Sequence, residues 1–313
     1  MDFQPSRDHN TSIPPIILSN KGIFHRIKIK INKLYLKNTT NYPFISGDSI
    51  ANCTDYYVFG PNNDQKVDVD KLKSSKSIFV SSHMLEKLLG SHFDSIGAKV
   101  LVTGNSDKNF DNLIALPQSI LLWVSQNNSI ESDPRIFPLP IGIENKRLGR
   151  TGFESYHGPI NNFSILDKIL IPPMSPTNSV RHYVTNRALN APYIFDVSTK
   201  YLSERKYFNL VRNYKFIFCC EGNGFENHRI WEALYQNSFP VMLETKWSKT
   251  LKRLKLPILF VASIDELNKK MLMDFRLEHA DFQSRQTPQL WVEFWKNLIA
   301  SGDINYAIQS LET

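Results

Sequence analysis

Short runs of apolar residues, each closed by polar or glycine residues, recur along most of this chain. A short run that is apolar on both faces is typical of a strand buried in a parallel sheet. Segments with helical apolar spacing separate these runs, so the pattern predicts an α/β protein. The predicted strands occupy residues 44–45, 77–80, 99–102, 120–124, 136–141, 169–171, 193–195, 216–218, 239–243 and 258–261.

The alternation lapses once, around residues 142–165, where Asn, Gly and Ser accumulate and predict a linker. We therefore expect an N-terminal arm and basic segment over 1–40 and two α/β domains, one over 41–160 and one over 161–313. A chain of 313 residues is long enough for two domains that each bury a core. Predicted helices of the second domain cover residues 180–189, 201–213, 227–236, 264–273 and 291–299.

The most informative stretch lies between the predicted strands at 216–218 and 239–243. A turn follows the first strand, and a helical segment begins at Asn227. A helix that starts from such a turn presents unpaired N–H groups and a partial positive charge, which suit an anionic ligand. The alternative interpretation is an ordinary tight turn. The turn residues are Glu221, Gly222, Asn223 and Gly224.

Arg229 and Glu232 lie three residues apart on this predicted helix and therefore share a face. A guanidinium has a fork of donors that matches phosphate, and a carboxylate accepts hydrogen bonds from sugar hydroxyls. A nucleotide diphosphate needs both groups, although the two residues could instead form a surface ion pair. His228 next to them is expected to contact phosphate or to pack against the turn.

This block resembles the C-terminal signature of exostosin-like glycosyltransferases, and more distantly that of fucosyltransferases. The resemblance is specific over residues 215–245. Cys220 stands where the family usually has proline, and Asn237 where a glycine usually precedes the Pro-Val strand. The matching positions are Cys219, Glu221, Gly222, Arg229, Glu232, Ala233, Leu234, Pro240 and Val241.

The resemblance implies a GT-B fold, in which two Rossmann-like domains face a cleft. Residues 41–160 would form the acceptor-side domain and residues 161–313 the nucleotide-sugar-binding domain. It implies an inverting glycosyltransferase that moves a sugar from a nucleotide-diphosphate donor to a glycan or lipid-linked acceptor, with no cofactor besides the donor as co-substrate. Arg229 would be the main diphosphate ligand and Arg181 the second, with Glu232 at the ribose and Glu221 at the donor sugar. A protein that binds nucleotide sugars or glycans without catalysis is the alternative.

The acceptor hydroxyl needs a base, which we expect from the first domain across the cleft. Asp48 is the first candidate because Ser46-Gly47-Asp48 follows the predicted first strand. Asp107 and His83 also follow predicted strands and are the alternatives. Each of the three could instead cap a helix.

No metal site is expected. The one Asp-x-Asp triplet, Asp68-Val69-Asp70, lies in a polar segment and predicts a solvated turn. The three cysteines lack Cys-x-x-Cys spacing and are expected to be reduced core residues. We therefore expect positive side chains to neutralise the diphosphate.

A formal charge of +7 favours anionic partners. Part of the excess lies in residues 21–37, where Lys and Arg occur without an intervening acid. An amphipathic helix lying on an anionic membrane is one interpretation, and a half-buried strand is favoured over it. No signature of a nucleic-acid-binding module is present, so nucleic acid is not an expected partner. The N-terminus lacks signal-peptide features, which predicts a cytoplasmic protein, peripheral at the inner face of the membrane if this segment binds lipid.

Overall fold

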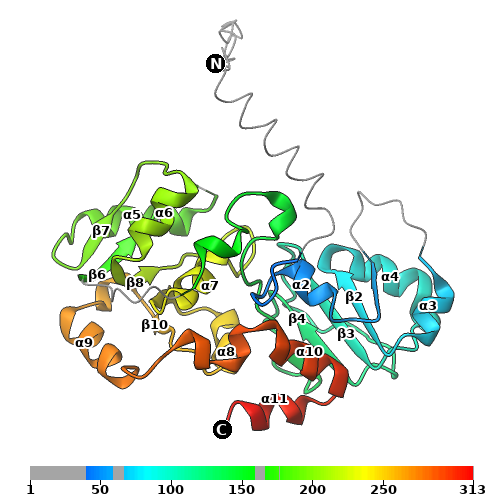
Figure 1. Cartoon of the computed structure of the whole chain (residues 1–313). Helices are drawn as coiled ribbons and strands as arrows, with labels where there is room; N and C mark the ends of the chain where they lie inside the picture. The colour runs from blue at the N-terminus through cyan, green and yellow to red at the C-terminus, as the bar shows by residue number, and fades with distance from the viewer. Residues whose placement is uncertain (1–39, 59–66, 159–165, 176, 313) are drawn as a thin grey trace, which may run out of the picture.

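The computed structural model describes residues 40–58, 67–158, 166–175 and 177–312. Two parallel five-stranded sheets, one in each half of the chain, lie side by side (Figure 1). The predicted α/β class is therefore confirmed. The basic segment 21–37 and the predicted domain boundary at 160/161 fall outside the described residues. Within those described, no helix has the length and apolar character needed to cross a bilayer.

The first sheet has its strands in sequence order. Right-handed crossovers in one direction place the connecting helices on one face, and α3 (Val69–Ser74) and α4 (Leu85–His92) pack there through Leu72 and Leu88. The opposite face is covered by α10 (Val292–Ser301), which comes from the far end of the chain. The strands are β1 (Tyr56–Val58), β2 (Ser77–Ser81), β3 (Val100–Gly104), β4 (Leu122–Ser125) and β5 (Ile136–Pro138).

The second sheet has the order β10-β9-β8-β6-β7. The chain begins at β6 and later continues on its other side with β8, so the topological switch point lies between these two neighbours. In open parallel sheets, ligands bind outside the carboxyl ends of the strands at this point. The strands are β6 (Leu166–Ile171), β7 (Phe195–Val197), β8 (Tyr214–Phe218), β9 (Phe239–Leu243) and β10 (Leu259–Val261).

Helices cover both faces of the second sheet. Buried residues of α5 and α9 pack on one face, and those of α6, α7 and α8 on the other. These helices are α5 (Ser179–Leu189), α6 (Glu204–Val211), α7 (His228–Tyr235), α8 (Lys246–Lys252) and α9 (Lys269–Glu278). The remaining ones are α2 (Gly47–Ala51), α11 (Ile304–Ser310) and the 3-10 turns Ser82–Met84, Phe93–Ser95, Lys146–Leu148, Glu154–Tyr156, Ile264–Glu266, Ser284–Gln286 and Pro288–Leu290.

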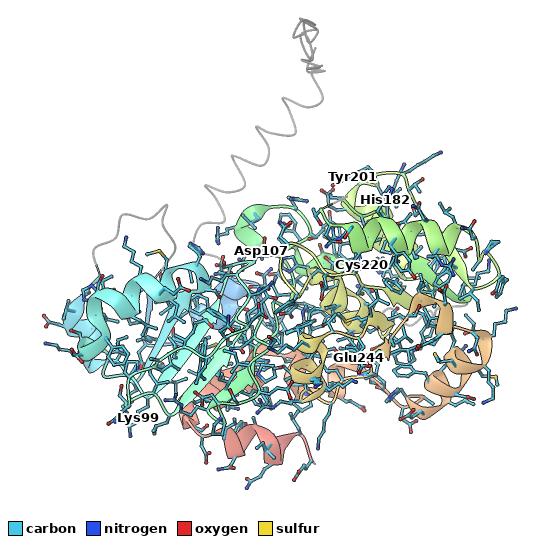
Figure 2. All side chains as sticks on the ribbon, turned by 180° about the vertical axis from the view of Figure 1, so that it is seen from behind. Lys99, Asp107, His182, Tyr201, Cys220 and Glu244 are labelled. Atoms are coloured by element: carbon cyan, nitrogen blue, oxygen red, sulfur yellow. The ribbon has the colours of Figure 1, made fainter. Side chains whose placement is uncertain are left out.

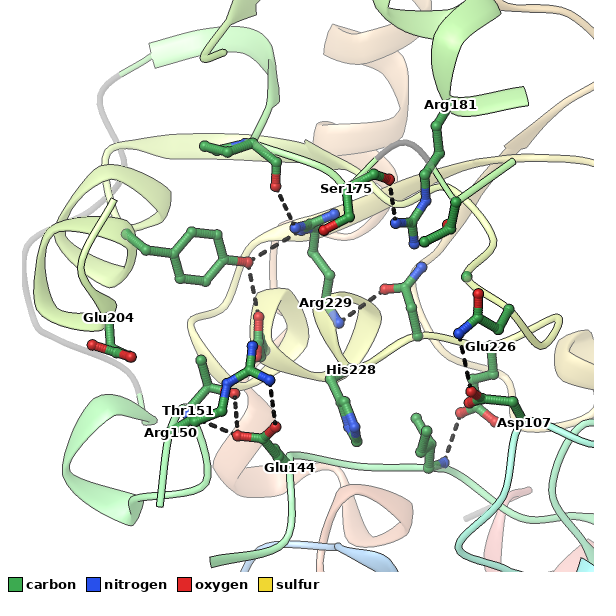
Figure 3. A pocket seen from close by; sticks show the side chains of 18 of the residues that line it. Asp107, Glu144, Arg150, Thr151, Ser175, Arg181, Glu204, Glu226, His228 and Arg229 are labelled. Carbon is green, nitrogen blue, oxygen red and sulfur yellow. Dashed lines mark hydrogen bonds and ion pairs between the residues drawn. The ribbon is translucent and has the colours of Figure 1, made fainter. Parts of the chain in front are cut away.

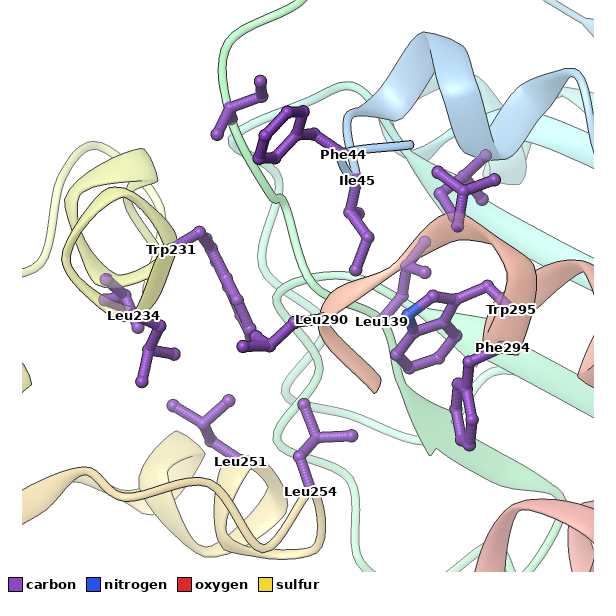
Figure 4. Close-up of a cluster of buried hydrophobic side chains, with 14 of the residues drawn as sticks. Phe44, Ile45, Leu139, Trp231, Leu234, Leu251, Leu254, Leu290, Phe294 and Trp295 are labelled. Carbon is purple, nitrogen blue, oxygen red and sulfur yellow. The ribbon is translucent and has the colours of Figure 1, made fainter. Parts of the chain in front are cut away.

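One hydrophobic core is shared by the two halves (Figure 4). This core fully buries Trp231 of α7, Leu290 of the 3-10 turn Pro288–Leu290 and Trp295 of α10. Residues of the first sheet, such as Phe137, belong to the same core. Burying one such side chain contributes about 1.5–3 kcal/mol. The contact between the halves is therefore a packed hydrophobic core.

The predicted strand at 44–45 is wrong. Phe44 makes a single antiparallel bridge to Trp291, and helix α2 begins at Gly47. Ser46 and Ser49 form a capping box, in which each side chain accepts the backbone N–H of the other, at 3.2 and 2.7 Å. This local capping chemistry decides the structure, and the two apolar residues are too few to oppose it.

The predicted solvated turn at Asp68-Val69-Asp70 is likewise wrong, because helix α3 begins there. Asp68 is the N-cap of α3 and accepts the N–H of Lys71 at 3.1 Å. An acid at this position satisfies a helix N–H that has no partner within the helix. The triplet therefore has a local structural role in the first half.

Candidate functional site

A pocket of about 510 Å³ lies between the two halves (Figure 3). The second half lines it with residues that follow β6 and β8, at the switch point of its sheet. This volume is within the range of small-molecule sites. The first half contributes Asp107, Ile141, Glu144, Arg150 and Thr151, which follow β3 and β5.

Most of the predicted ligand residues line this one pocket. Glu221 and Gly224 belong to the same turn but do not line it. The predicted residues that the structure brings together are Asp107, Arg181, Gly222, Asn223, Asn227, His228, Arg229 and Glu232.

Asn227 fixes the start of α7. Its Oδ1 accepts the N–H of Arg229 at 2.9 Å, and its Nδ2 donates to the carbonyl of Cys220. An asparagine N-cap therefore ties the end of the strand–turn segment to the helix. Arg229, in the first turn of α7, points from this cap toward the pocket (Figure 3).

Arg229 and Glu232 are joined through Tyr207 of α6. Arg229 Nε donates to the Tyr207 hydroxyl at 3.2 Å, and that hydroxyl donates to Glu232 Oε2 at 2.8 Å. Burial raises the pKa of Tyr207 well above its usual value, so the phenol keeps the proton that it donates. The two predicted ligand residues are therefore held in fixed positions by a third residue.

Arg181 is held by backbone carbonyls. Its Nε donates to the carbonyl of Glu221 at 2.8 Å, and its Nη1 to that of Ser175 at 3.0 Å. Arg229 Nη2 likewise donates to the carbonyl of Pro173 at 3.0 Å. Within the described ranges, Arg229 Nη1 and Arg181 Nη2 have no hydrogen-bond partner. Each arginine thus keeps one nitrogen for a ligand.

Among the described residues, no carboxylate lies within ion-pair distance of either arginine. Burial lowers the pKa of Arg229, but the Tyr207 hydroxyl and the charge of Glu232 beyond it outweigh burial, so the pKa of Arg229 is raised. Burial, and then the neighbouring charge of Arg229, lower the pKa of Arg181. The two like charges repel each other, and an anion between them would offset that repulsion. The part of the pocket lined by these two arginines therefore favours an anionic group, although five of the described acids also line the pocket: Asp107, Glu144, Glu204, Glu226 and Glu232.

The glycine-bearing turn lies directly against the first half. A Cβ on Gly224 would lie 2.7 Å from Asn127 Nδ2 and 3.0 Å from the carbonyl of Asp107. Asn223 Nδ2 donates to Asp107 Oδ2 at 3.3 Å. Gly224 therefore serves the close approach of the halves, whereas Gly222, with no such conflict, borders the pocket.

His228 also joins the two halves. Its Nδ1 lies 2.8 Å from the carbonyl of Gly142, which can only accept, so Nδ1 carries a proton. Gly142 has φ +67°, and a Cβ there would lie 2.0 Å from the carbonyl of Ile45. The backbone that receives the histidine thus requires glycine.

Of the three predicted bases, the structure brings only Asp107 to the pocket; Figure 2 shows it at the boundary between the halves. Asp48 lies in α2, where its carboxylate accepts from Arg147 Nε at 2.6 Å and from Asn105 Nδ2 at 3.1 Å. His83 is exposed, with its Nδ1 3.3 Å from Ser81 Oγ. Neither Asp48 nor His83 lines the pocket.

The stretch predicted as a linker contributes to the site. Glu144, Arg150 and Thr151 line the pocket. Glu144 Oε2 accepts the N–H of Thr151 at 3.0 Å, and Glu144 Oε1 lies 3.9 Å from Arg150 Nη1. A low content of apolar residues marked this segment as a connection and gave no sign that it folds over a pocket.

Glu226 is a further pocket residue that sequence reasoning missed. It is 3% exposed and lines the pocket, one residue before the cap of α7. Its Oε1 accepts the N–H of Ile141 at 2.7 Å and the indole N–H of Trp231 at 2.5 Å, whereas Oε2 has no hydrogen-bond partner among the residues that the structure describes. Burial raises its pKa to about 8. The one sequence feature that could have identified Glu226 is its position in the turn, directly before the N-cap Asn227.

Comparison with known protein families and with curated proteins gave no match. The resemblance to exostosin-like enzymes therefore depends on the signature residues quoted above.

Proposed function

We propose that this protein is a glycosyltransferase that transfers a sugar from a nucleotide-diphosphate donor to a glycan or lipid-linked acceptor. In this proposal the two halves act as the donor-side and acceptor-side domains of a GT-B enzyme. The observation that carries it is the pair Arg181 and Arg229, which line one pocket at a sheet switch point and form no direct ion pair with a carboxylate of the described residues. A diphosphate would supply the negative charge and the oxygen acceptors for the two arginine nitrogens that have no partner among the described residues.

The remaining groups fit the same donor. Glu232 is 4% exposed, and Tyr207 holds its Oε2, so its carboxylate is positioned to accept from ribose hydroxyls. When the bond to the donor sugar breaks, negative charge grows on the leaving diphosphate, and preorganised cations stabilise that charge. Attack by an acceptor hydroxyl on the opposite face of the sugar would invert the anomeric centre.

Thermal-shift measurements with ADP, CDP, GDP, UDP and their sugar conjugates test the proposal. A ligand that binds the folded state raises its melting temperature. We expect one nucleotide series to stabilise the wild type, and Arg229→Ala to lose this effect. Arg285→Ala, in the 3-10 turn Ser284–Gln286 and not among the pocket-lining residues, is the control and should keep it.

Turnover separates the two interpretations of the site. Release of nucleoside diphosphate from the stabilising conjugate, with methyl glycosides as acceptors, would establish transfer. Binding without release would favour the non-catalytic nucleotide-sugar-binding protein. Absence of stabilisation by every nucleotide would contradict both.

A further inference from the structure

Glu226 is a buried carboxyl group on the wall of the pocket that contributes nothing to diphosphate binding as proposed above. One oxygen, Oε1, receives both of its hydrogen bonds, from Ile141 of the first half and from Trp231 of α7. The other oxygen, Oε2, is buried and has no hydrogen-bond partner in the described part of the chain. A buried polar atom without a partner carries a free-energy cost, and a ligand group can remove it.

The hydrogen bonds decide where a proton would reside on this carboxyl group. Oε1 accepts two N–H donors and therefore acts as the carbonyl oxygen of the neutral acid, which leaves the proton on Oε2. Within the described part of the chain, no ion pair stabilises the charged form. Burial raises the pKa of Glu226, and the hydrogen bonds from Ile141 and Trp231 lower it only in part. A group of this kind exchanges a proton at Oε2 near neutral pH.

The charged and titratable side chains around it come from several elements that border the pocket. Asp107 follows β3, Glu144 follows β5, and His228 lies two residues further along the chain from Glu226; Arg181 and Arg229 line the same pocket. Asp107 is exposed and accepts from Asn223, and Glu144 accepts from Thr151. Among the described acids that line the pocket, which include the buried Glu232, only Glu226 has a buried oxygen without a hydrogen-bond partner.

We propose that Glu226 is the base that takes the proton from the acceptor hydroxyl, an inference that rests on the proposed function. The acceptor O–H bond breaks, and its proton passes to Glu226 Oε2. The acceptor oxygen forms a bond to the anomeric carbon, and the bond from that carbon to the diphosphate oxygen breaks. The electron pair of that bond leaves with the diphosphate, and Glu226 returns its proton to water before the next cycle.

The test compares wild type, Glu226→Gln and Asp107→Asn, with the exposed Glu86→Gln of α4 as control. Each variant is assayed for binding of the nucleoside diphosphate that stabilises the wild type most, and for its release from the matching nucleotide sugar between pH 6 and 9. Glutamine keeps an oxygen for Ile141 and Trp231 but cannot take a proton. We expect Glu226→Gln to bind the nucleotide within about threefold of wild type and to lose at least about 100-fold in kcat.

The pH profile identifies the base. Wild-type kcat/KM should rise with pH, with its midpoint near the pKa of about 8 of Glu226 and a plateau above that pH, and Glu226→Gln should lose this rise. Glu226→Asp keeps a carboxyl group one methylene shorter, so the midpoint of the rise should move; this arm decides the matter if the glutamine variant is poorly folded. An unchanged midpoint in Glu226→Asp, or a normal rate and profile in Glu226→Gln, would overturn the proposal.

Two further outcomes are informative. If Asp107→Asn abolishes the rise while Glu226→Gln leaves it, Asp107 is the base, and the proposed function stands without this inference. If the wild type neither binds nor cleaves any nucleotide sugar, the proposed function fails, and the inference fails with it.

Discussion

The hydroxyl of Tyr207 donates to Glu232 at 2.8 Å while it accepts from the guanidinium of Arg229. Removing this oxygen in Tyr207→Phe leaves a buried carboxylate oxygen and an arginine nitrogen without their partner. We expect nucleotide affinity to fall about 5- to 30-fold, which corresponds to about 1–2 kcal/mol. Isothermal titration calorimetry measures this loss. Tyr183→Phe, on the exposed surface of α5, should bind as wild type does.

Two arginines of α5 offer a matched comparison for the charge of the pocket. Arg181 lines the pocket, whereas Arg187 forms an exposed ion pair with Asp265. We expect Arg181→Ala to weaken nucleoside-diphosphate binding about 10- to 100-fold, since a charge-assisted hydrogen bond to phosphate is lost. Arg187→Ala should change the affinity less than twofold. Equal effects of the two substitutions would indicate general electrostatic attraction without a specific contact.

Gly224 should not tolerate a side chain. The methyl group of Gly224→Ala would collide with Asn127 and with the backbone of Asp107, so we expect a loss of about 1–3 kcal/mol in the free energy of unfolding. Gly90→Ala in α4 meets nothing within 4 Å and should stabilise the protein by about 0.5–1 kcal/mol. Urea denaturation measures both. Equal stability of the two variants would contradict the close approach of the halves at Gly224.

The raised pKa of Glu226 also affects stability. The folded state holds this proton up to about pH 8, whereas the unfolded chain releases it near the ordinary value of 4.5. The stabilising contribution is therefore complete below pH 4.5 and is lost as the pH rises to about 8. Because glutamine does not titrate, Glu226→Gln should gain stability relative to wild type over this range, by up to about 4 kcal/mol. Urea denaturation at pH 5 and pH 8.5 measures the change, and a constant difference would contradict it.

Chelation tests how the diphosphate is neutralised. If Arg181 and Arg229 supply the positive charge, EDTA should leave the nucleotide-induced rise in melting temperature unchanged to within about 1 °C at constant ionic strength. Loss of that rise, and its recovery on addition of Mg²⁺, would show that a divalent ion takes part in binding.

Local patterns were sufficient to predict much of the second half. The apolar runs that became β6, β8 and β9 are buried on both faces, and such runs stand out in any sequence. The start of α7 was predictable because Asn227 caps it. Near Ser46 the same reasoning failed, because two apolar residues before a capping box do not make a strand.

The missing parts of the site depend on contacts between distant segments. Glu226 accepts a hydrogen bond from Ile141, which lies 85 residues away in the first half. Tyr207 contacts Arg229 only because α6 packs beside α7. No periodicity encodes which residue of one half will face a given residue of the other. The Glu144–Thr151 segment is the same case, since a polar stretch over a pocket and a polar linker have similar compositions.

The fully buried core that contains Trp231 and Leu290 has a consequence for ligand exchange. Trp231 follows Arg229 by only two residues on α7, so the helix that borders the pocket is also anchored between the halves. A wide hinge rotation would expose these side chains to water, at about 1.5–3 kcal/mol each. Ligand entry and departure should therefore depend on small movements at the rim, where Tyr201 is 82% exposed, while the halves keep their mutual orientation.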